Sequence, residues 1–138
     1  MTSSQVANAK NYTVTSIEIS RVSLLSEDSE SLWGHNIEVP GLGSCVQGHG
    51  VDVVGWVLGR NCPVLAVELS HNGTVFQRVP VSRRPDVAAV YTEVPWADNS
   101  GFRTTVRMLG ITEFDLLVRA VLQDESCVRL GVIHGRCR

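Results

Sequence analysis

The chain has 138 residues, of which 43% are hydrophobic, and its formal net charge is −2 at pH 7. This composition excludes a disordered chain and a membrane-spanning protein, and the length suits one domain with its own core. Residues 1–69 carry three basic and seven acidic side chains, whereas residues 70–138 carry nine and seven. Because nucleic-acid-binding proteins concentrate basic residues in a stripe, we expect a partner that is neither nucleic acid nor membrane.

The ends of the chain and its cysteines indicate where the protein resides. We expect residues 1–11 to form a flexible tail. The N-terminus has no basic region followed by an apolar one, so we expect no signal peptide. The basic end, Gly135–Arg138, is typical of a chain cut at a linker. Four cysteines without CxxC pairing predict reduced thiols in the cytoplasm, and a Cys45–Cys62 or Cys127–Cys137 disulfide remains open if the protein is secreted.

Two strands and a loop are predicted in the first 50 residues. Tyr12–Val22 is rich in Thr, Ile and Val and predicts a first strand. Leu32–Val39 is long enough for a short edge strand. Residues 40–50 are rich in glycine and contain a proline, so we expect a loop there. This loop lacks the Gly-Lys-Ser/Thr of a phosphate-binding loop and the GxSxG of a nucleophile elbow.

The stretch from Val51 to Leu58 is apolar at nearly every position, which favours a strand covered on both faces. Trp56 is therefore expected to be a core side chain. Alternation begins at Leu65 and predicts that Leu65, Val67 and Leu69 point toward the core.

A β-hairpin is predicted at Asn72-Gly73, because this dipeptide readily supplies the two positive φ angles of a type I′ turn. Pairing across a two-residue turn places Leu69 opposite Phe76, which suits a core contact. The same pairing places Val67 opposite Arg78, which does not. We therefore expect either a β-bulge near Arg78 or a longer hairpin loop.

One short helical turn is predicted near residues 85–91. Pro85 fixes φ at a helix start, Asp86 can cap free N–H groups, and Arg84 is expected to form a local ion pair. The helical face expected to close the end of the core consists of Val87, Val90 and Tyr91.

Alternation is clearest in Gly101–Leu109, Phe114–Gln123 and Cys127–His134. Gly101 is expected to let the chain turn into its strand, and Phe102 to face the core. The inward residues predicted for the last two strands are Phe114, Leu116, Val118, Ala120, Leu122, Val128, Leu130 and Val132. About seven or eight antiparallel strands in residues 12–136 predict a single all-β, Ig-like sandwich, with a closed barrel as the alternative.

No catalytic set is recognisable in the sequence, and we expect neither a cofactor nor a metal. The four histidines are dispersed, and Cys45 with His49 lacks the further ligands that a metal site needs. A carbohydrate site is conceivable, because aromatic rings stack on sugars and polar groups bind their hydroxyls. Its candidate residues are Trp33, Arg84, Tyr91, Trp96, Asp98 and Asn99, although the aromatic residues among them suit closure of the sandwich ends better.

Several short motifs in residues 50–138 recur in one known order. They are Gly55–Leu58, Pro63–Glu68, Asn72-Gly73, Arg84–Val87, Ser100–Arg103, Leu130-Gly131, Ile133 and Gly135-Arg136. In this order the chain resembles the Ig-like β-sandwich accessory domain that lies N-terminal to bacterial glycosyltransferase or sulfotransferase domains. The resemblance implies a cytoplasmic, non-catalytic module and supplies no active-site residues.

Two classes of function follow as expectations. The first is an interaction module that packs on a catalytic transferase domain in the same polypeptide, or on a second copy of itself. The second is a carbohydrate-binding module that uses its loop aromatics.

Overall fold

The computed structural model describes residues 16–25, 30–41, 43, 45–48 and 50–137. The predicted tail at residues 1–11 lies outside this part of the chain. The one helix in the described residues is α2 (Pro85–Val90). The strands are β1 (Ser16–Leu24), β2 (Leu32–Val39), β3 (Cys45–Gln47), β4 (Gly50–Gly59), β5 (Val64–His71), β6 (Thr74–Pro80), β7 (Ser82–Arg83), β8 (Asn99–Arg107), β9 (Glu113–Leu122) and β10 (Cys127–Cys137).

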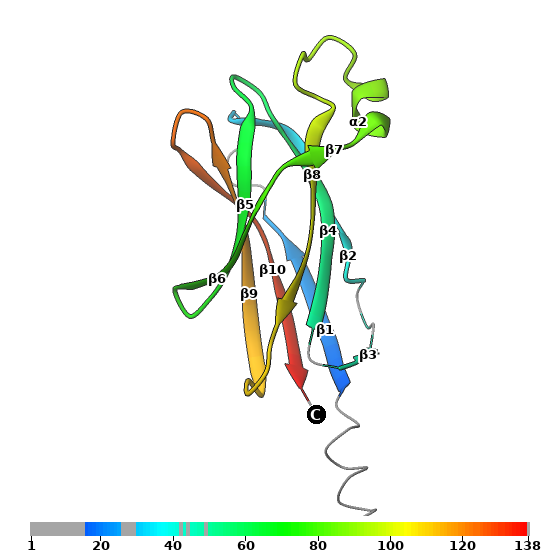
Figure 1. Ribbon diagram of the computed structural model, residues 1–138, viewed down its shortest axis with the longest axis vertical. Helices are drawn as coiled ribbons and strands as arrows, with labels where there is room; N and C mark the ends of the chain where they lie inside the picture. The colour runs from blue at the N-terminus through cyan, green and yellow to red at the C-terminus, as the bar shows by residue number, and fades with distance from the viewer. Residues whose placement is uncertain (1–15, 26–29, 42, 44, 49, 138) are drawn as a thin grey trace, which may run out of the picture.

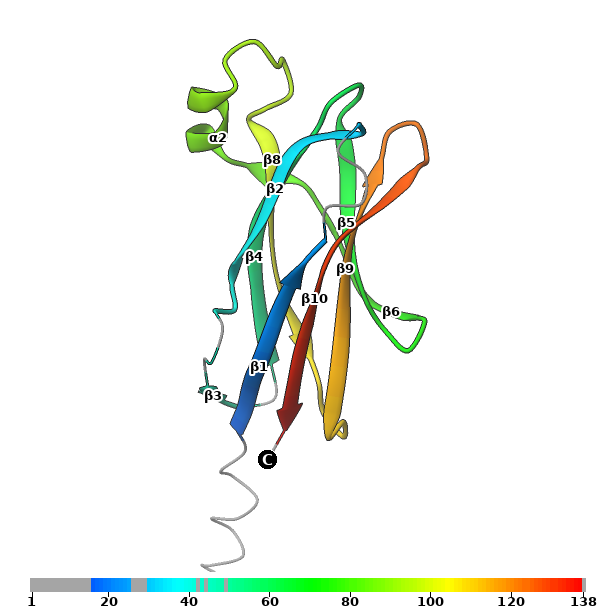
Figure 2. The ribbon, with the colours of Figure 1, turned by 180° about the vertical axis from the view of Figure 1, so that it is seen from behind.

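The strands form two antiparallel sheets that face each other as two layers (Figures 1 and 2). The six-stranded sheet has the order β3-β1-β10-β9-β5-β6, and the four-stranded sheet has the order β2-β4-β8-β7. This arrangement confirms the predicted all-β sandwich, and the open edges of both sheets exclude a closed barrel. The described residues contain more strands than predicted because β3 and β7 span only three and two residues.

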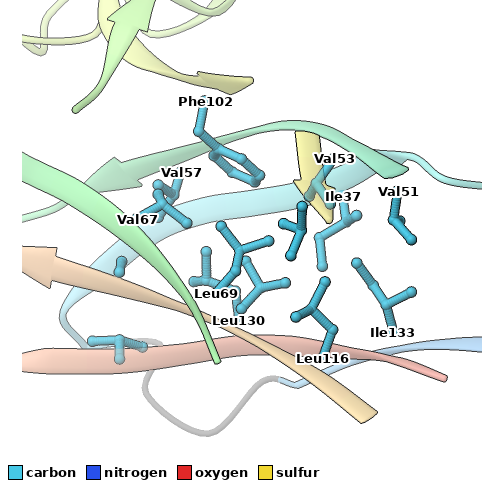
Figure 3. Close-up of a cluster of buried hydrophobic side chains, with 14 of the residues drawn as sticks. Ile37, Val51, Val53, Val57, Val67, Leu69, Phe102, Leu116, Leu130 and Ile133 are labelled. Atoms are coloured by element: carbon cyan, nitrogen blue, oxygen red, sulfur yellow. The ribbon is translucent and has the colours of Figure 1, made fainter. Parts of the chain in front are cut away.

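The core fills the space between the two sheets with aliphatic side chains and Phe102 (Figure 3). Leu69, Leu116 and Leu130 of the six-stranded sheet are fully buried, and Phe102 of the four-stranded sheet is 1% exposed. Full burial of a side chain of this size contributes roughly 1.5–3 kcal/mol relative to exposure, so these contacts hold the layers together. Phe102 of β8 faces the core as predicted. In β9, every residue that was predicted to point inward is buried.

β-bulges change the predicted inward face of two strands. In β5 the register shifts between Val64 and Ala66, so Ala66 is buried and Leu65 is 45% exposed. The prediction for Leu65 was therefore wrong. In β10 the register shifts between Arg129 and Gly131, and Ile133 is fully buried in place of the predicted Val132. A bulge adds one residue to a strand, which reverses the faces of the residues beyond it.

The predicted Asn72-Gly73 hairpin turn is present. Asn72 and Gly73 have φ angles of 51° and 81°, and His71 pairs with Thr74 across the turn. Both turn residues therefore adopt the positive φ that a type I′ turn requires. The hairpin loop has two residues, so the longer loop is excluded.

The pairing of this hairpin differs from the predicted one. A bulge at Phe76 shifts the register, so Leu69 lies opposite Gln77 and Val67 lies opposite Val79. The expected pairing of Leu69 with Phe76 across the strands is therefore absent, and the unsuitable pairing of Val67 with Arg78 is avoided. The expected bulge exists, but it lies closer to the turn, where it lets two valines pair across the strands.

The predicted Gly-rich loop at residues 40–50 contains part of the six-stranded sheet. Cys45–Gln47 forms β3 and pairs with β1, where Val46 lies opposite Ile17. Gly50 already belongs to β4. The loop prediction was therefore too broad, because three residues between glycines suffice for a short edge strand.

The described residues can be compared with two expectations, one on disulfides and one on membrane-spanning helices. Cys62, Cys127 and Cys137 are free cysteines, so the Cys127–Cys137 disulfide does not form. In the described ranges, no helix has both the length and the apolar character needed to cross a membrane.

Substituting Leu69 tests the core packing against a matched surface position. We expect Leu69→Ala to lower the free energy of unfolding by about 2–5 kcal/mol, because it leaves a cavity between the sheets. Leu65→Ala on the same strand should cost less than about 1 kcal/mol, because Leu65 is largely exposed. Denaturant unfolding of both variants measures the difference. Equal losses would contradict the observed bulge in β5.

Candidate functional site

A small apolar cluster covers one end of the outer face of the four-stranded sheet, where α2 and the loop after it pack (Figure 1). We call it the outer cluster. Its buried residues are Leu58, Val87 and Ala97, with Trp56, Ala88, Tyr91, Val94 and Trp96 partly buried around them. The helical turn predicted near residues 85–91 is confirmed, and Val87 packs as expected. Val90 does not, because it is 75% exposed.

The aromatic residues proposed for sugar stacking are mostly committed to this packing. The Trp96 Nε1–H donates to the Gly59 carbonyl over 2.8 Å, and the Tyr91 ring centroid lies 6.1 Å from that of Trp56. Trp56 itself lies on the outer face of β4 and not in the main core. Trp33 lies apart from the outer cluster, is 45% exposed, and has the Arg60 guanidinium 4.5 Å from its ring.

The Arg84 side chain forms hydrogen bonds to β2, β4 and α2 and so holds these three elements together. We call this set of contacts the clamp. Its guanidinium donates to both carboxylate oxygens of Glu38 on β2, at 2.8 and 2.9 Å. It also donates to both oxygens of Asp86, at 2.9 and 2.8 Å, and to the Gly55 carbonyl at 3.2 Å. The predicted local pair with Asp86 is therefore present, together with a long-range pair that the sequence did not indicate.

Gly101 makes this clamp possible in a way that differs from the prediction. It is the third residue of β8 and not a turn residue. A Cβ at this position would lie 2.5 Å from the Arg84 Cγ. Gly101 therefore leaves room for the aliphatic stem of Arg84 to cross the strand, and any larger residue would displace it.

The electrostatics of the clamp lower one pKa strongly. The hydrogen bonds from Arg84 are the largest cause that lowers the Asp86 pKa, to about 2, and the same contacts raise the Arg84 pKa. Because Asp86 and Arg84 stay ionised over the ordinary pH range, the clamp is fixed and carries no proton-transfer chemistry.

Asp98 and Asn99, which were also candidates for the carbohydrate site, have structural roles. The Asp98 carboxylate accepts a hydrogen bond of 2.8 Å from Arg83, and its backbone carbonyl accepts one of 2.7 Å from the Arg84 N–H. Asn99 is the first residue of β8, where it pairs with Arg83. The structure thus gathers Arg84 and Asp98 around the start of β8, where both hold the chain between α2 and the sheet.

The other end of the outer face of the four-stranded sheet is uncovered. We call it the open face, and its residues are Asp52, Val54, Arg103, Thr105 and Arg107. A hollow of about 470 Å³ lies on it, bounded on one side by the partly exposed Val39 of β2. The Thr105 hydroxyl donates to the Asp52 carboxylate over 2.6 Å. Among the arginines that the structure describes, Arg103 and Arg107 are the ones whose guanidinium has no hydrogen-bond, ion-pair or aromatic-ring partner, since Arg60 contacts the Trp33 ring.

A polar cavity of about 510 Å³ lies on the outer face of the opposite, six-stranded sheet. Residues from four strands line it, among them Ser20, Arg21, His71, Glu113, Asp115 and His134. Arg21, His134 and Asp115 lie directly opposite one another across β1, β10 and β9. The Arg21 Nη2 lies 3.3 Å from His134 Nε2, and His134 Nδ1 lies 2.5 Å from Asp115 Oδ1.

The sequence did not reveal this cavity, although its histidines were inspected. His134 was counted among the dispersed histidines, and the bulge in β10 turns it to the outer face. In β1, a register shift between Ile19 and Arg21 likewise places Arg21 on the outer face. His35, in contrast, bridges the layers, with its Nε2 lying 3.2 Å from the Leu130 carbonyl.

Neither the chemistry of these sites nor comparison with known proteins identifies a reaction. Within the described ranges, no three His, Cys, Asp or Glu side chains are grouped in a way that could hold a metal ion. No family model, curated protein or solved structure matches the chain significantly. The function must therefore be inferred from the surfaces themselves.

Titration of Asp86 tests the clamp. We expect its carboxyl group to titrate near pH 2 and, in Arg84→Gln, near its ordinary pKa of about 3.9. The lowered pKa means that Asp86 stabilises the fold above its ordinary pKa, and that this contribution is lost as the pH falls toward about 2. Carboxyl-detected NMR measures the midpoints. Glu38→Gln is the control, because it leaves the contacts between Arg84 and Asp86 in place.

Proposed function

We propose that this chain is a non-catalytic, cytoplasmic interaction module that docks a catalytic domain onto its open face. The observation that carries the proposal is the pair of exposed arginines, Arg103 and Arg107, which lack partners among the described residues. We further propose that the catalytic domain is a glycosyltransferase or sulfotransferase in the same polypeptide, in line with the family that the motifs of residues 50–138 resemble.

The strand order supports the Ig-like assignment within this proposal. Ig-like sandwiches place strands A-B-E-D in one sheet and G-F-C, with C′ in the variable type, in the other. The order β2-β4-β8-β7 corresponds to the first set, and β10-β9-β5-β6 corresponds to the second. β1 and β3 extend the second sheet beyond G. Because one fold can carry many functions, this topology supports the resemblance alone, and the proposed role rests on the open face.

The chemistry of the open face suits a protein partner. Unpaired arginines next to partly exposed valines offer both bidentate hydrogen-bond donors and apolar contact, and arginine is enriched in protein interfaces. Arg103 lies directly opposite Val54 across β8 and β4, so the cation and the apolar side chain form one continuous patch. A partner that places carboxylates over Arg103 and Arg107 would neutralise both cations.

The alternative carbohydrate site at the loop aromatics has weaker support. Tyr91 and Trp96 pack in the outer cluster, and Trp96 donates its indole N–H to the backbone carbonyl of Gly59. Of the three proposed aromatic residues, Trp33 alone remains largely exposed. A single ring covered by Arg60 is a poor stacking platform, so the interaction module is the better proposal.

Charge reversal on the open face tests the docking. In a polypeptide that joins this chain to the proposed transferase domain, we expect Arg103→Glu with Arg107→Glu to raise hydrogen exchange in β8 and β4. Contact between the domains should weaken at least about tenfold, because like charges would then face each other. Hydrogen-exchange mass spectrometry of the joined polypeptide, compared with this chain alone, gives the measurement.

The control is Arg21→Glu, which alters an exposed arginine on the opposite sheet. It should leave exchange in β8 and β4 unchanged. Exchange that is indifferent both to the added domain and to the double charge reversal would refute docking on the open face. A dimer of this chain alone, dissociated by the same double variant, would instead identify the partner as a second copy.

A further inference from the structure

The polar cavity on the six-stranded sheet has no part in the docking proposed above, because it lies on the opposite layer. Its volume of about 510 Å³ falls within the range of roughly 300–1,000 Å³ that is typical of small-molecule sites. Its walls come from β1, β9, β10 and the end of β5. In Figures 1 and 2 the tip of the β5–β6 hairpin projects beyond the neighbouring strands, and this tip bounds the cavity on one side.

Arg21, His134 and Asp115, three of the residues that line the cavity, are linked to one another before any ligand arrives. Arg21 can only donate hydrogen bonds, so His134 Nε2 must accept, and His134 Nδ1–H must donate to Asp115. The resulting chain of hydrogen bonds crosses three neighbouring strands. The Ser20 hydroxyl donates to the His134 carbonyl over 3.2 Å and ties β1 to β10 at the same place. Sites supported in this way on strands bind with little loss of side-chain entropy.

The fixed charges of the cavity disfavour a charged ligand. Arg21 supplies one positive charge, and Glu113 and Asp115 supply two negative charges. An anion would meet the two carboxylates, whereas a cation would meet the guanidinium. An uncharged ligand avoids both penalties.

The free hydrogen-bonding groups include both donors and acceptors. Arg21 has five N–H groups, and its contact with His134 uses one of them. The Glu113 carboxylate has no hydrogen-bond partner among the described residues, and Asp115 is bonded to His134 through Oδ1 alone. A hydroxyl group can donate to a carboxylate and accept from a guanidinium at the same time, which neither an amide carbonyl nor an ammonium can do.

We propose that this cavity binds an uncharged, hydroxyl-rich ligand of about the size of a monosaccharide. Arg21 donates to hydroxyl oxygens of the ligand, while Glu113 and Asp115 accept from its hydroxyl groups. His134 acts as a positioning residue that orients Arg21 and Asp115. The site is distinct from the loop aromatics and relies on polar side chains of the sheet, with no aromatic platform.

An NMR titration of the whole chain tests this proposal. The probes are glucose, galactose, mannose, N-acetylglucosamine, maltose and myo-inositol, with inorganic phosphate and spermidine as charged comparators. We expect saturable shifts of the Arg21, Asp115 and His134 amides with at least one saccharide or with inositol, and none with the charged compounds. A response to maltose but not to glucose would assign the site to a glycan chain and not to a free monosaccharide.

Two variants of the cavity and one matched control make the test specific. Arg21→Gln and Glu113→Gln should each weaken binding by roughly tenfold or more, because each removes a charged hydrogen-bonding group. Arg103→Gln, on the open face of the other sheet, should leave the affinity unchanged. The Glu113 carboxylate has no hydrogen-bond partner among the residues that the structure describes, so its variant remains informative if Arg21→Gln does not fold.

Three outcomes would overturn the proposal. They are a flat response to all the neutral probes, an affinity that is indifferent to both cavity variants, and shifts of the same amides with phosphate or spermidine alone. None of these outcomes bears on docking at the open face, because Arg103 and Arg107 do not line the cavity.

Discussion

The burial of one face of β1, β4, β5, β8, β9 and β10 between the two sheets is the constraint on which the rest of the molecule depends. Phe102 and the leucines of β5, β9 and β10 fill that space, so the residues that alternate with them must lie on an outer face. The outer face of the six-stranded sheet carries the polar cavity, and that of the four-stranded sheet carries the outer cluster and the open face. Any ligand or partner must therefore be recognised outside the core.

β-bulges then decide which side chains occupy those outer faces. Without the shift at Arg129/Gly131, the alternation of β10 would turn His134 toward the core, where its ring would need a buried partner. With the shift, His134 faces outward between Arg21 and Asp115. Bulges are common next to binding sites because they re-aim a side chain without breaking the sheet. The bulges in β1 and β10 fit that use, since the residues that they redirect line one cavity.

Sequence patterns predicted local structure well and long-range pairing poorly. The inward face of β9, from Phe114 to Leu122, was predicted at every position because its alternation is uninterrupted. Asn72-Gly73 and Pro85 similarly act through their own backbone angles. The Arg84–Glu38 pair joins residues 46 positions apart, and no local pattern signals it. The cavity was missed for the same reason: its residues are neighbours only after four strands have paired.

The two outer faces differ in how their arginines are used, and this difference argues for two kinds of recognition. Arg21 is already bonded to a histidine and sits within a concave, mixed-charge wall, which suits a small ligand that exchanges hydrogen bonds. Arg103 and Arg107 lack partners among the described residues and lie beside the partly exposed Val39 and Val54, which suits a broad surface that supplies carboxylates and excludes water. Because the core separates the two faces, one could be occupied without blocking the other. The two proposals are therefore compatible, because a catalytic domain docked on one sheet would leave the opposite sheet open to a small, hydroxylated molecule.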